Sequence, residues 1–171
     1  MGKPLKQSLG EVDKTISFCK YYSKNIHDIL PTQVKSDAKV KTLVKYLPLG
    51  VVYTIIPFNF PFYLAFKGGL PNLLLGNVIL CRAADSTPLL GQRIESLMNK
   101  AGYDSGEYQN VYTSRDQLDH VLKNPHIVGV SFTGSTKAGA AISEIAGRHL
   151  KRSVMELGGN DPFVVLADAD I

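Results

Sequence analysis

The sequence predicts a doubly wound, parallel α/β sheet. Short apolar runs of strand length alternate with segments of helical length along most of the chain. This alternation is typical of parallel strands joined by crossover helices. Four of the apolar runs lead into polar or glycine-containing loops, which read PFNFP, CRAAD, FTGST and ELGG. Because the ligand of such a sheet binds at the carboxyl ends of its strands, we expect these four loops at one edge.

The composition is that of an ordinary globular domain. The 171 residues are 44% hydrophobic and 20% charged, which is enough for one domain with a real core. The longest apolar run is broken by Pro48 and Gly50 and is too short to cross a bilayer. The first residues lack the apolar core of a secretory signal, and two cysteines suggest no disulfide framework. We therefore expect no membrane insertion and a reducing compartment, either the cytoplasm or the mitochondrial matrix.

The basic residues are concentrated in the first quarter of the chain. The net charge is +4, and residues 1–47 hold nine Lys against four acids. These lysines are scattered at helical spacing rather than clustered with stacking aromatics, as a nucleic-acid surface would require. A solvated helix face is the better interpretation, and no nucleic-acid partner is expected.

The first 47 residues form a separate region in this interpretation. Apolar residues at steps of three or four predict a helix over residues 8–28, which Pro31 ends. Lysines partly alternate with apolar residues over 38–47, which predicts an edge strand with one solvated face. Residues 48–171 would then form the α/β domain.

The elements of this α/β domain follow from the same patterns. Thr87 at the N-cap with Pro88 behind it marks a helix start, and Ser114 is the expected cap of a shorter helix. The expected strands are residues 49–56, 78–83, 108–112 and 127–132, a strand that ends at Glu156, and 162–166. The expected helices end near Gly76, Ala101, Asn124 and His149.

Three of the loops carry groups suited to chemistry on a nucleotide or a carbonyl compound. The Asn59 amide can donate a hydrogen bond to a developing oxyanion, although an isolated turn Asn more often satisfies its own backbone. Gly134 permits a close approach where the next helix starts, and free N–H groups there favour a phosphate. Arg82 and Asp85 can meet ribose hydroxyls or a phosphate, or can form a simple surface ion pair.

The fourth loop follows Glu156, a carboxylate at the end of a short apolar run. A carboxylate there is costly unless it has a function or a partner, and a salt bridge before an ordinary turn is the alternative. The four histidines lie on polar segments without metal-ligand spacing, so no metal site is expected. Met98 and Met155 are expected in the core.

These motifs together resemble the aldehyde dehydrogenase superfamily. The similarity is carried by PFNFP, CRAADSTP, FTGS and KRSVMELGGNDPFVVLADADI. The N-terminal stretch MGKPLKQSLGEVDK and YLPLGVVYTIIPFNFP look most like the succinate-semialdehyde dehydrogenase branch. The resemblance implies an NAD(P)-dependent oxidation of an aldehyde, succinic semialdehyde in this branch, to the carboxylic acid.

The resemblance also implies roles for individual residues. Asn59 matches the side-chain oxyanion donor, and Glu156 matches the general base that activates water for deacylation. Asp85 matches an acidic ribose ligand typical of NAD-preferring members, which makes NAD the expected cofactor, with NADP as the alternative. The other matched dinucleotide contacts are Ile56, Pro57, Phe58, Arg82, Gly134, Ser135, Leu157 and Gly158.

The chain departs from the family pattern in several places. Phe58 replaces the usual Trp, Arg82 replaces a Lys, and the turn at residues 112–116 lacks the glycines that many members have there. The family's nucleophilic Cys lies downstream of the ELGG motif, and neither Cys19 nor Cys81 matches it. The chain therefore resembles part of an aldehyde dehydrogenase, cut at both ends and without its catalytic cysteine domain, and we expect it to be inactive alone.

Three functions remain open at this point. The first is a fragment of an active aldehyde dehydrogenase, whose substrate is a small aldehyde. The second is a non-catalytic structural or assembly subunit derived from that fold. The third is a free-standing nucleotide-binding module. The expected edge strand and the uncovered apolar faces predict that the chain is a homo-oligomer, a subunit of a larger assembly, or poorly soluble.

Overall fold

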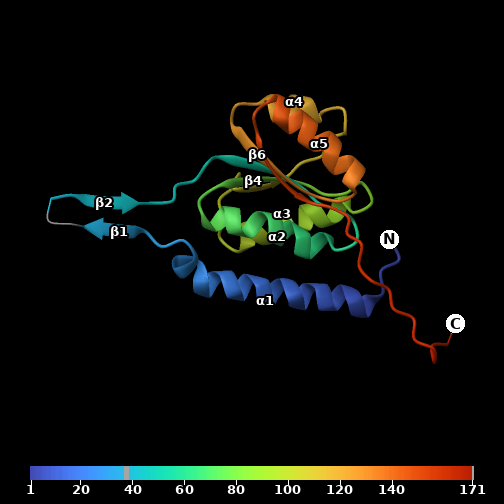
Figure 1. Cartoon of the computed structure of the whole chain (residues 1–171). Coiled ribbons are helices and arrows are strands. Elements are labelled where there is room, and N and C mark those ends of the chain that lie inside the picture. The colour runs from blue at the N-terminus through green and yellow to red at the C-terminus, as the bar shows by residue number, and fades with distance from the viewer. Residues whose placement is uncertain (37–38, 171) are drawn as a thin grey trace.

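A five-stranded parallel sheet forms the centre of the molecule, which a computed structural model describes over residues 1–36 and 39–170 (Figure 1). The strands are β3 (Val51–Ile55), β4 (Val78–Arg82), β5 (Tyr108–Asn110), β6 (Ile127–Thr133) and β7 (Arg152–Glu156). Their order is β5-β4-β3-β6-β7, and every neighbouring pair is parallel. The chain thus winds outward from β3 in one direction and then returns to the other side of β3, as the doubly wound prediction requires.

Helices cover both faces of this sheet. Helices α2 (Pro61–Leu74) and α3 (Pro88–Lys100) lie on one face, and α4 (Leu118–Lys123) and α5 (Thr136–Arg148) lie on the other (Figure 1). Alternate residues of β3 serve the two layers, because Val52 packs with the first cluster and Tyr53 with the second. Met98 belongs to the first cluster and is buried, whereas Met155 is only partly buried against the second. The expected core position of Met98 is confirmed.

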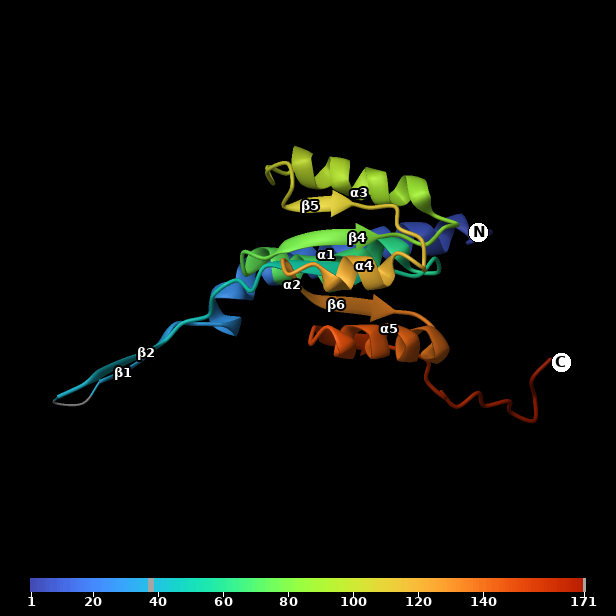
Figure 2. The same ribbon diagram turned by 90° about the horizontal axis from the view of Figure 1, so that it is seen from above.

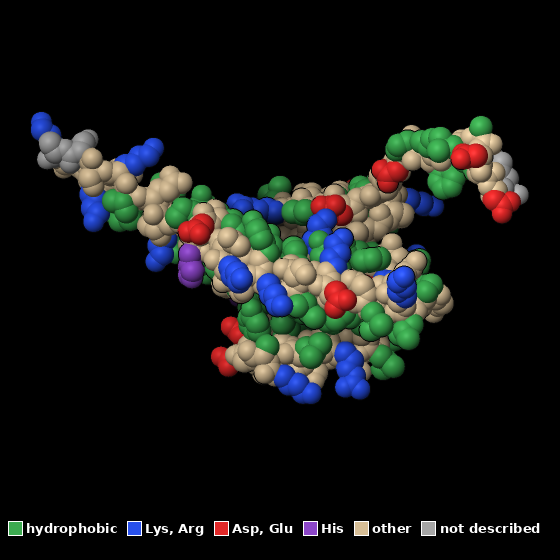
Figure 3. Space-filling view, turned by 90° about the horizontal axis from the view of Figure 1, so that it is seen from below, with side chains coloured by type: hydrophobic (Ala, Val, Ile, Leu, Met, Phe, Trp, Pro, Cys, Tyr) green, Lys and Arg blue, Asp and Glu red, His purple; other side chains and the backbone are tan. Residues whose placement is uncertain are grey.

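Helix α1 (Leu5–Ile29) packs on the outer side of α2 rather than on the sheet (Figure 1). Its outer face carries lysines in water, and they are visible along the helix in Figure 3. The helix begins three residues earlier than expected and ends two residues before Pro31, in agreement with the role of that proline.

The expected strand at 38–47 is wrong in its form. Two short strands, β1 (Gln33–Ser36) and β2 (Lys41–Val44), pair antiparallel as a hairpin that projects from the body (Figures 1 and 2). All eight strand residues are exposed, so no single solvated face exists. The alternation of lysine and apolar residues in the expected strand therefore belongs to a hairpin that projects from the body, and not to an edge strand with one solvated face. Ala38, at the start of the expected strand, lies outside the described residues.

Two further local predictions need correction, and a third is confirmed in position but not in its hydrogen bond. The run at 162–166 forms no strand, because β7 ends the sheet and the tail leaves it with Phe163 92% exposed. Ser114 does not cap a helix, since its N–H and hydroxyl both bond Gln117 Oε1 and α4 starts only at Leu118. Thr87 occupies the N-cap of α3 as expected, but its hydroxyl donates to Ala84 O at 3.3 Å instead of capping.

No helix among the described residues is long and apolar enough to cross a membrane.

Candidate functional site

The four loops singled out by their composition meet at one edge of the sheet. In the parallel registers Ile55 is the partner of Arg82 and of Phe132, and Thr133 is the partner of Glu156. The carboxyl ends of β3, β4, β6 and β7 are therefore level with one another. The convergence expected from the sequence is confirmed.

A cavity of about 560 Å³ opens at this edge, where the strand order reverses between β3 and β6. That reversal is the point at which doubly wound sheets bind their ligands. Of the predicted site residues, those that line it are Ile56, Pro57, Arg82, Gly134 and Ser135. Lining residues that the sequence reasoning missed include Tyr53, Arg115, Phe132, Lys137 and Ala138. The remaining predicted residues lie outside this cavity, on the same edge or in a neighbouring pocket.

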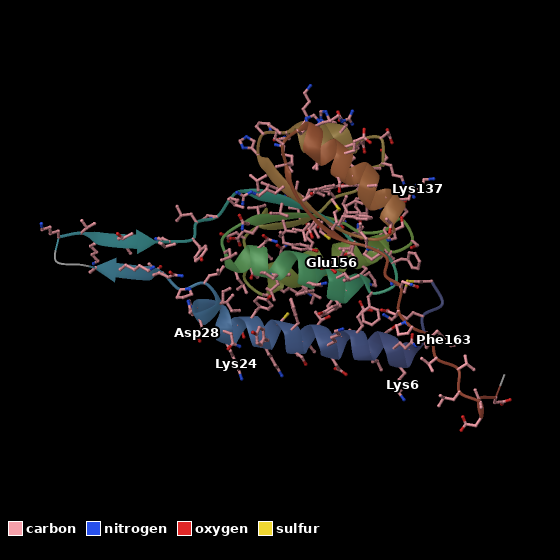
Figure 4. All side chains as sticks on the ribbon, viewed as in Figure 1. Lys6, Lys24, Asp28, Lys137, Glu156 and Phe163 are labelled. Atoms are coloured by element: carbon pink, nitrogen blue, oxygen red, sulfur yellow. The ribbon has the colours of Figure 1, made fainter. Side chains whose placement is uncertain are left out.

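The start of α5 forms one wall of the cavity. The Oγ of Ser135 accepts a hydrogen bond from Ala138 N at 3.3 Å, which makes Ser135 the N-cap of the helix. A helix leaves the N–H groups of its first turn without backbone partners, and Ser135 satisfies one of them. The Lys137 side chain adds a positive charge at the same end (Figure 4). This wall is suited to an anionic group such as a pyrophosphate.

Gly134 connects β6 to α5 at a point without room for a side chain. A Cβ there would lie 2.4 Å from Cζ of Phe132, and the Gly134 N–H donates to Glu156 O at 3.0 Å. The glycine therefore allows the Phe132 ring to fold under the turn and holds β7 beside it. The predicted close approach exists, but the Phe132 ring fills it.

Arg82 and Asp85 lie at the boundary between the main cavity and a second pocket of about 410 Å³. Arg82 Nη2 lies 2.5 Å from Asp85 Oδ1, and Arg82 Nε donates to Thr113 O at 3.2 Å. The Arg82 side chain is 16% exposed while that of Asp85 is 79% exposed. The ion-pair alternative is therefore realised, and the exposed carboxylate still faces the pocket beside Tyr112.

Asn59 lies in the exposed loop between β3 and α2. Its Oδ1 accepts from Phe60 N at 3.1 Å, so the amide does satisfy its neighbouring backbone. This bond uses the oxygen and leaves Nδ2 as the available donor. The hydrogen bonds found among the described residues give Nδ2 no acceptor. Phe58, in the same loop, is 54% exposed and does not line the cavity.

Glu156 stands at the end of β7 and makes an ion pair with Lys67 of α2, at 3.1 Å. Its side chain is 54% exposed, so the carboxylate is accessible. The Leu157 side chain rests on Gly139 of α5, where a Cβ would come within 2.4 Å of Leu157 Cδ2. Gly158 follows beside Thr136. The ELGG segment is thus held across the start of α5, next to the cavity.

The two cysteines and the side chains that could bind a metal ion are the other candidate reactive groups. Burial raises the pKa of the Cys81 thiol to about 11, and burial also raises the pKa of Cys19. Both thiols are free, but Cys19 lies in α1, and Cys81, although it precedes Arg82 near the end of β4, is fully buried in the core and does not line the cavity. Among the described residues no group of three or more His, Cys, Asp or Glu side chains is arranged to hold a metal ion.

Comparison with known proteins gives one consistent result. Residues 1–171 match the family model described as the aldehyde dehydrogenase family. An NADP(+) succinate-semialdehyde dehydrogenase of Deinococcus radiodurans is 37% identical over 171 residues, covering 100% of this chain and 36% of that protein. An NAD(P)+ succinate semialdehyde dehydrogenase of Escherichia coli is 36% identical, with 100% and 37% covered.

Solved structures agree with the sequence matches. The crystal structure of succinic semialdehyde dehydrogenase from Streptococcus pyogenes in complex with NADP+ superposes with a TM-score of 0.90 at 34% identity. That match covers 99% of this chain and 37% of the other. The chain spans little more than a third of the length of the relatives it matches.

Proposed function

Since the chain belongs to the aldehyde dehydrogenase family, we propose that its 171 residues supply the dinucleotide-binding part of an NAD(P)-dependent aldehyde dehydrogenase. The observation that carries this proposal is the cavity at the strand-order reversal, with the start of α5 as one wall. The region before residue 48, α1 with the β1–β2 hairpin, is proposed as an oligomerisation region, and residues 48–171 as the binding domain.

The cavity residues fit a dinucleotide by their chemistry. Ile56 and Pro57 supply an apolar wall for a flat ring, and Phe58, in the exposed loop that follows them, is proposed to contact the cofactor from outside the cavity. Ser135 and the first N–H groups of α5, beside Gly134, supply donors for the pyrophosphate. Arg82 and Asp85 are proposed to meet the ribose of the adenosine half, because their pocket adjoins the main cavity.

Asn59 and Glu156 are the proposed catalytic residues. The free Nδ2 of Asn59 is a donor for the oxyanion that forms when a nucleophile adds to the aldehyde, which a pre-placed amide stabilises by about 3 kcal/mol. Glu156, accessible at the end of β7, is the proposed base that takes a proton from the water of the deacylation step. Leu157 and Gly158, held on α5, are proposed to border the nicotinamide. A nicotinamide dinucleotide bound here supplies the hydride acceptor.

The proposed substrate is succinic semialdehyde. This rests on the names of the bacterial relatives and on the identity of 37% and 36% to two of them. The nucleophile that adds to the aldehyde is proposed to come from outside these 171 residues. Bacterial relatives also favour the cytoplasm over the mitochondrial matrix as the compartment.

A role in assembly is the second candidate, and exposed apolar side chains favour it. Val34 and Leu43 of the hairpin are 54% and 58% exposed, and Phe163 and Val164 of the tail are 92% and 74% exposed. Apolar side chains on the tail are visible in Figure 3. Such surfaces are covered in an oligomer, so we propose that the chain associates with copies of itself or with further subunits.

Calorimetric titration of the 171-residue chain with NAD+ and with NADP+ tests the binding proposal. We expect saturable binding that Arg82→Met weakens and that the matched variant Arg93→Met, exposed on α3, leaves unchanged. Circular dichroism shows whether each variant is folded. Failure of the folded chain to bind either dinucleotide at millimolar concentration would overturn the proposal and favour the assembly role.

A further inference from the structure

Helix α1 carries a buried carboxylate that is not part of the loop edge. Glu11 is only 4% exposed, and its Oε1 accepts from the backbone N–H groups of Phe62, at 2.7 Å, and Tyr63, at 3.0 Å. These N–H groups belong to the first turn of α2, which starts at Pro61 and contains no acidic residue of its own. The residue at the N-cap of α2, Phe60, has no side-chain acceptor. Glu11 therefore caps α2 from another helix.

Lys3 joins this carboxylate to the loop that carries Asn59. Its Nζ pairs with Glu11 Oε2, and its side chain is 9% exposed. The same Nζ donates to the Asn59 carbonyl oxygen at 3.0 Å and lies 3.8 Å from the centre of the Phe60 ring. All three contacts converge on the junction between the Asn59 loop and α2.

The contacts restrict the loop at both of its ends. At one end, β3 is fixed in the middle of the sheet, and at the other end Glu11 fixes the first turn of α2. Lys3 binds the carbonyl oxygen of Asn59 between these two points. The side-chain oxygen of Asn59 bonds the next N–H along the backbone, so the direction of Nδ2 depends on that same stretch of backbone.

We propose that Lys3 and Glu11 are positioning residues that together hold the Asn59 amide in place, an inference that rests on the proposed function of Asn59. An oxyanion donor contributes only when it is placed before the reaction, because a mobile amide must first be ordered. A buried ion pair is a weak source of stability, since desolvation offsets much of the attraction. Its bonds to this particular loop give the Lys3–Glu11 pair a more specific role than stability.

The test uses the 15N-labelled 171-residue chain and does not depend on activity. The side-chain NH₂ signals of Asn59 are identified by their loss in Asn59→Asp. In Lys3→Met we expect these signals to shift while the amides of Phe62 and Tyr63 remain protected from hydrogen exchange. In Glu11→Ala we expect exchange of both amides to accelerate at least about tenfold, together with the shift at Asn59.

Matched controls come from the same helix. Lys6 and Asp13 are exposed on α1, and Lys6 points away from the body in Figure 4. Lys6→Met and Asp13→Ala should leave the Asn59 signals in place. Lys3→Arg keeps the positive charge, so its Asn59 signals should lie close to their wild-type positions. Glu11→Gln keeps the shape and one acceptor oxygen but loses the charge that pairs with Lys3. If Glu11→Ala does not fold, Glu11→Gln should shift the Asn59 signals while the Phe62 and Tyr63 amides remain protected.

Unchanged Asn59 signals in folded Lys3→Met and Glu11 variants would overturn the proposal, as would an equal shift in Lys6→Met. Either result would leave dinucleotide binding untouched, so the two proposals fail separately. In an active protein that contains these residues, the same substitutions should lower kcat without changing KM for the dinucleotide. This split is expected because neither Lys3 nor Glu11 lines the cavity.

Discussion

Glu156 Oε2 lies 3.1 Å from Lys67 Nζ, which joins the last strand of the sheet to the helix that follows the Asn59 loop. Both side chains are partly exposed, at 54% and 39%, so water screens their attraction. The carboxylate can exchange this partner for water at small cost. An ion pair of this kind suits a proposed base that must first release one partner and then accept a proton.

Lys67→Met should therefore change the free energy of unfolding by less than about 1 kcal/mol. Urea unfolding of the 171-residue chain measures this, with the exposed Lys100→Met on α3 as control. A loss above about 2 kcal/mol would mean that the pair is a structural bridge.

Glu156→Gln in an active protein should lower the deacylation rate by about 10²- to 10⁴-fold, the range for general acid–base groups.

Two helix glycines should respond differently to alanine. A Cβ on Gly91 would lie 1.9 Å from Oδ1 of Asn110, whose amide is buried, whereas the atoms nearest to a Cβ on Gly139 belong to the Leu157 side chain. Leu157 is 40% exposed and can move aside. We expect Gly91→Ala to destabilise by about 1–3 kcal/mol and Gly139→Ala to stay within about 1 kcal/mol. Equal losses in the free energy of unfolding for Gly91→Ala and Gly139→Ala, measured with urea, would contradict this prediction.

The buried Cys81 thiol predicts a loss of stability in alkali. Burial raises its pKa from 9.0 to about 11, so the folded chain keeps the proton while the unfolded chain releases it. The stabilisation is thus complete below the unfolded pKa and is lost as pH rises through the window from 9.0 to about 11. Melting temperatures across this window should fall less steeply for Cys81→Ala. An identical slope in the variant would assign the loss to other groups, such as the buried tyrosines.

The 171-residue chain by itself should not oxidise aldehydes. Burial raises the pKa of both thiols, and neither thiol lines the cavity. Without a nucleophile no covalent intermediate forms for Asn59 and Glu156 to act on. Residual rates are then orders of magnitude lower than those of a site that has its nucleophile. Absorbance of the reduced dinucleotide with succinic semialdehyde measures this. Turnover that persists in Cys19→Ala and Cys81→Ala, in a preparation free of host dehydrogenases, would refute the prediction.

Asp85 should favour NAD+ over NADP+. Its carboxylate is 79% exposed at the second pocket and would repel a 2′-phosphate, while it can accept from free ribose hydroxyls. Arg82 opposes this preference, but its guanidinium is already paired with Asp85. The ratio of the two dissociation constants should shift toward NADP+ in Asp85→Ser. A wild-type preference for NADP+ would show that Arg82 dominates.

The strands and the binding edge were predictable because their signals are local. Apolar runs such as 127–132 are bounded by turns, and every strand of a parallel sheet ends at the same side. The composition of each loop therefore indicated its place. The hairpin was not predictable in form, since Gln33–Ser36 and Lys41–Val44 pair with each other and their side chains are all exposed. The tail at 162–166 has strand composition but finds no partner beside β7.

The contacts that hold the Asn59 loop have no local signal. Glu11 and Phe62 are 51 residues apart, and nothing near either residue indicates the other. A Lys before the start of a helix and a Glu eight residues further on look like two solvated charges. Only the packing of α1 on α2 reveals that both are buried. The sequence indicated which loops converge, whereas the packing determines how the Asn59 amide is held.

Because β3 lies in the centre of the sheet, its two edges gain their partner strands at different times during synthesis. One edge of β3 pairs with β4, the next strand of the sheet in sequence, but the other edge pairs with β6, which follows only after α3, β5 and α4. As a nascent chain emerges, β3 to β5 are available as a half-sheet whose inner edge lacks its partner. We expect that edge to be the most aggregation-prone surface during synthesis, until Ile127–Thr133 leaves the ribosome and closes it.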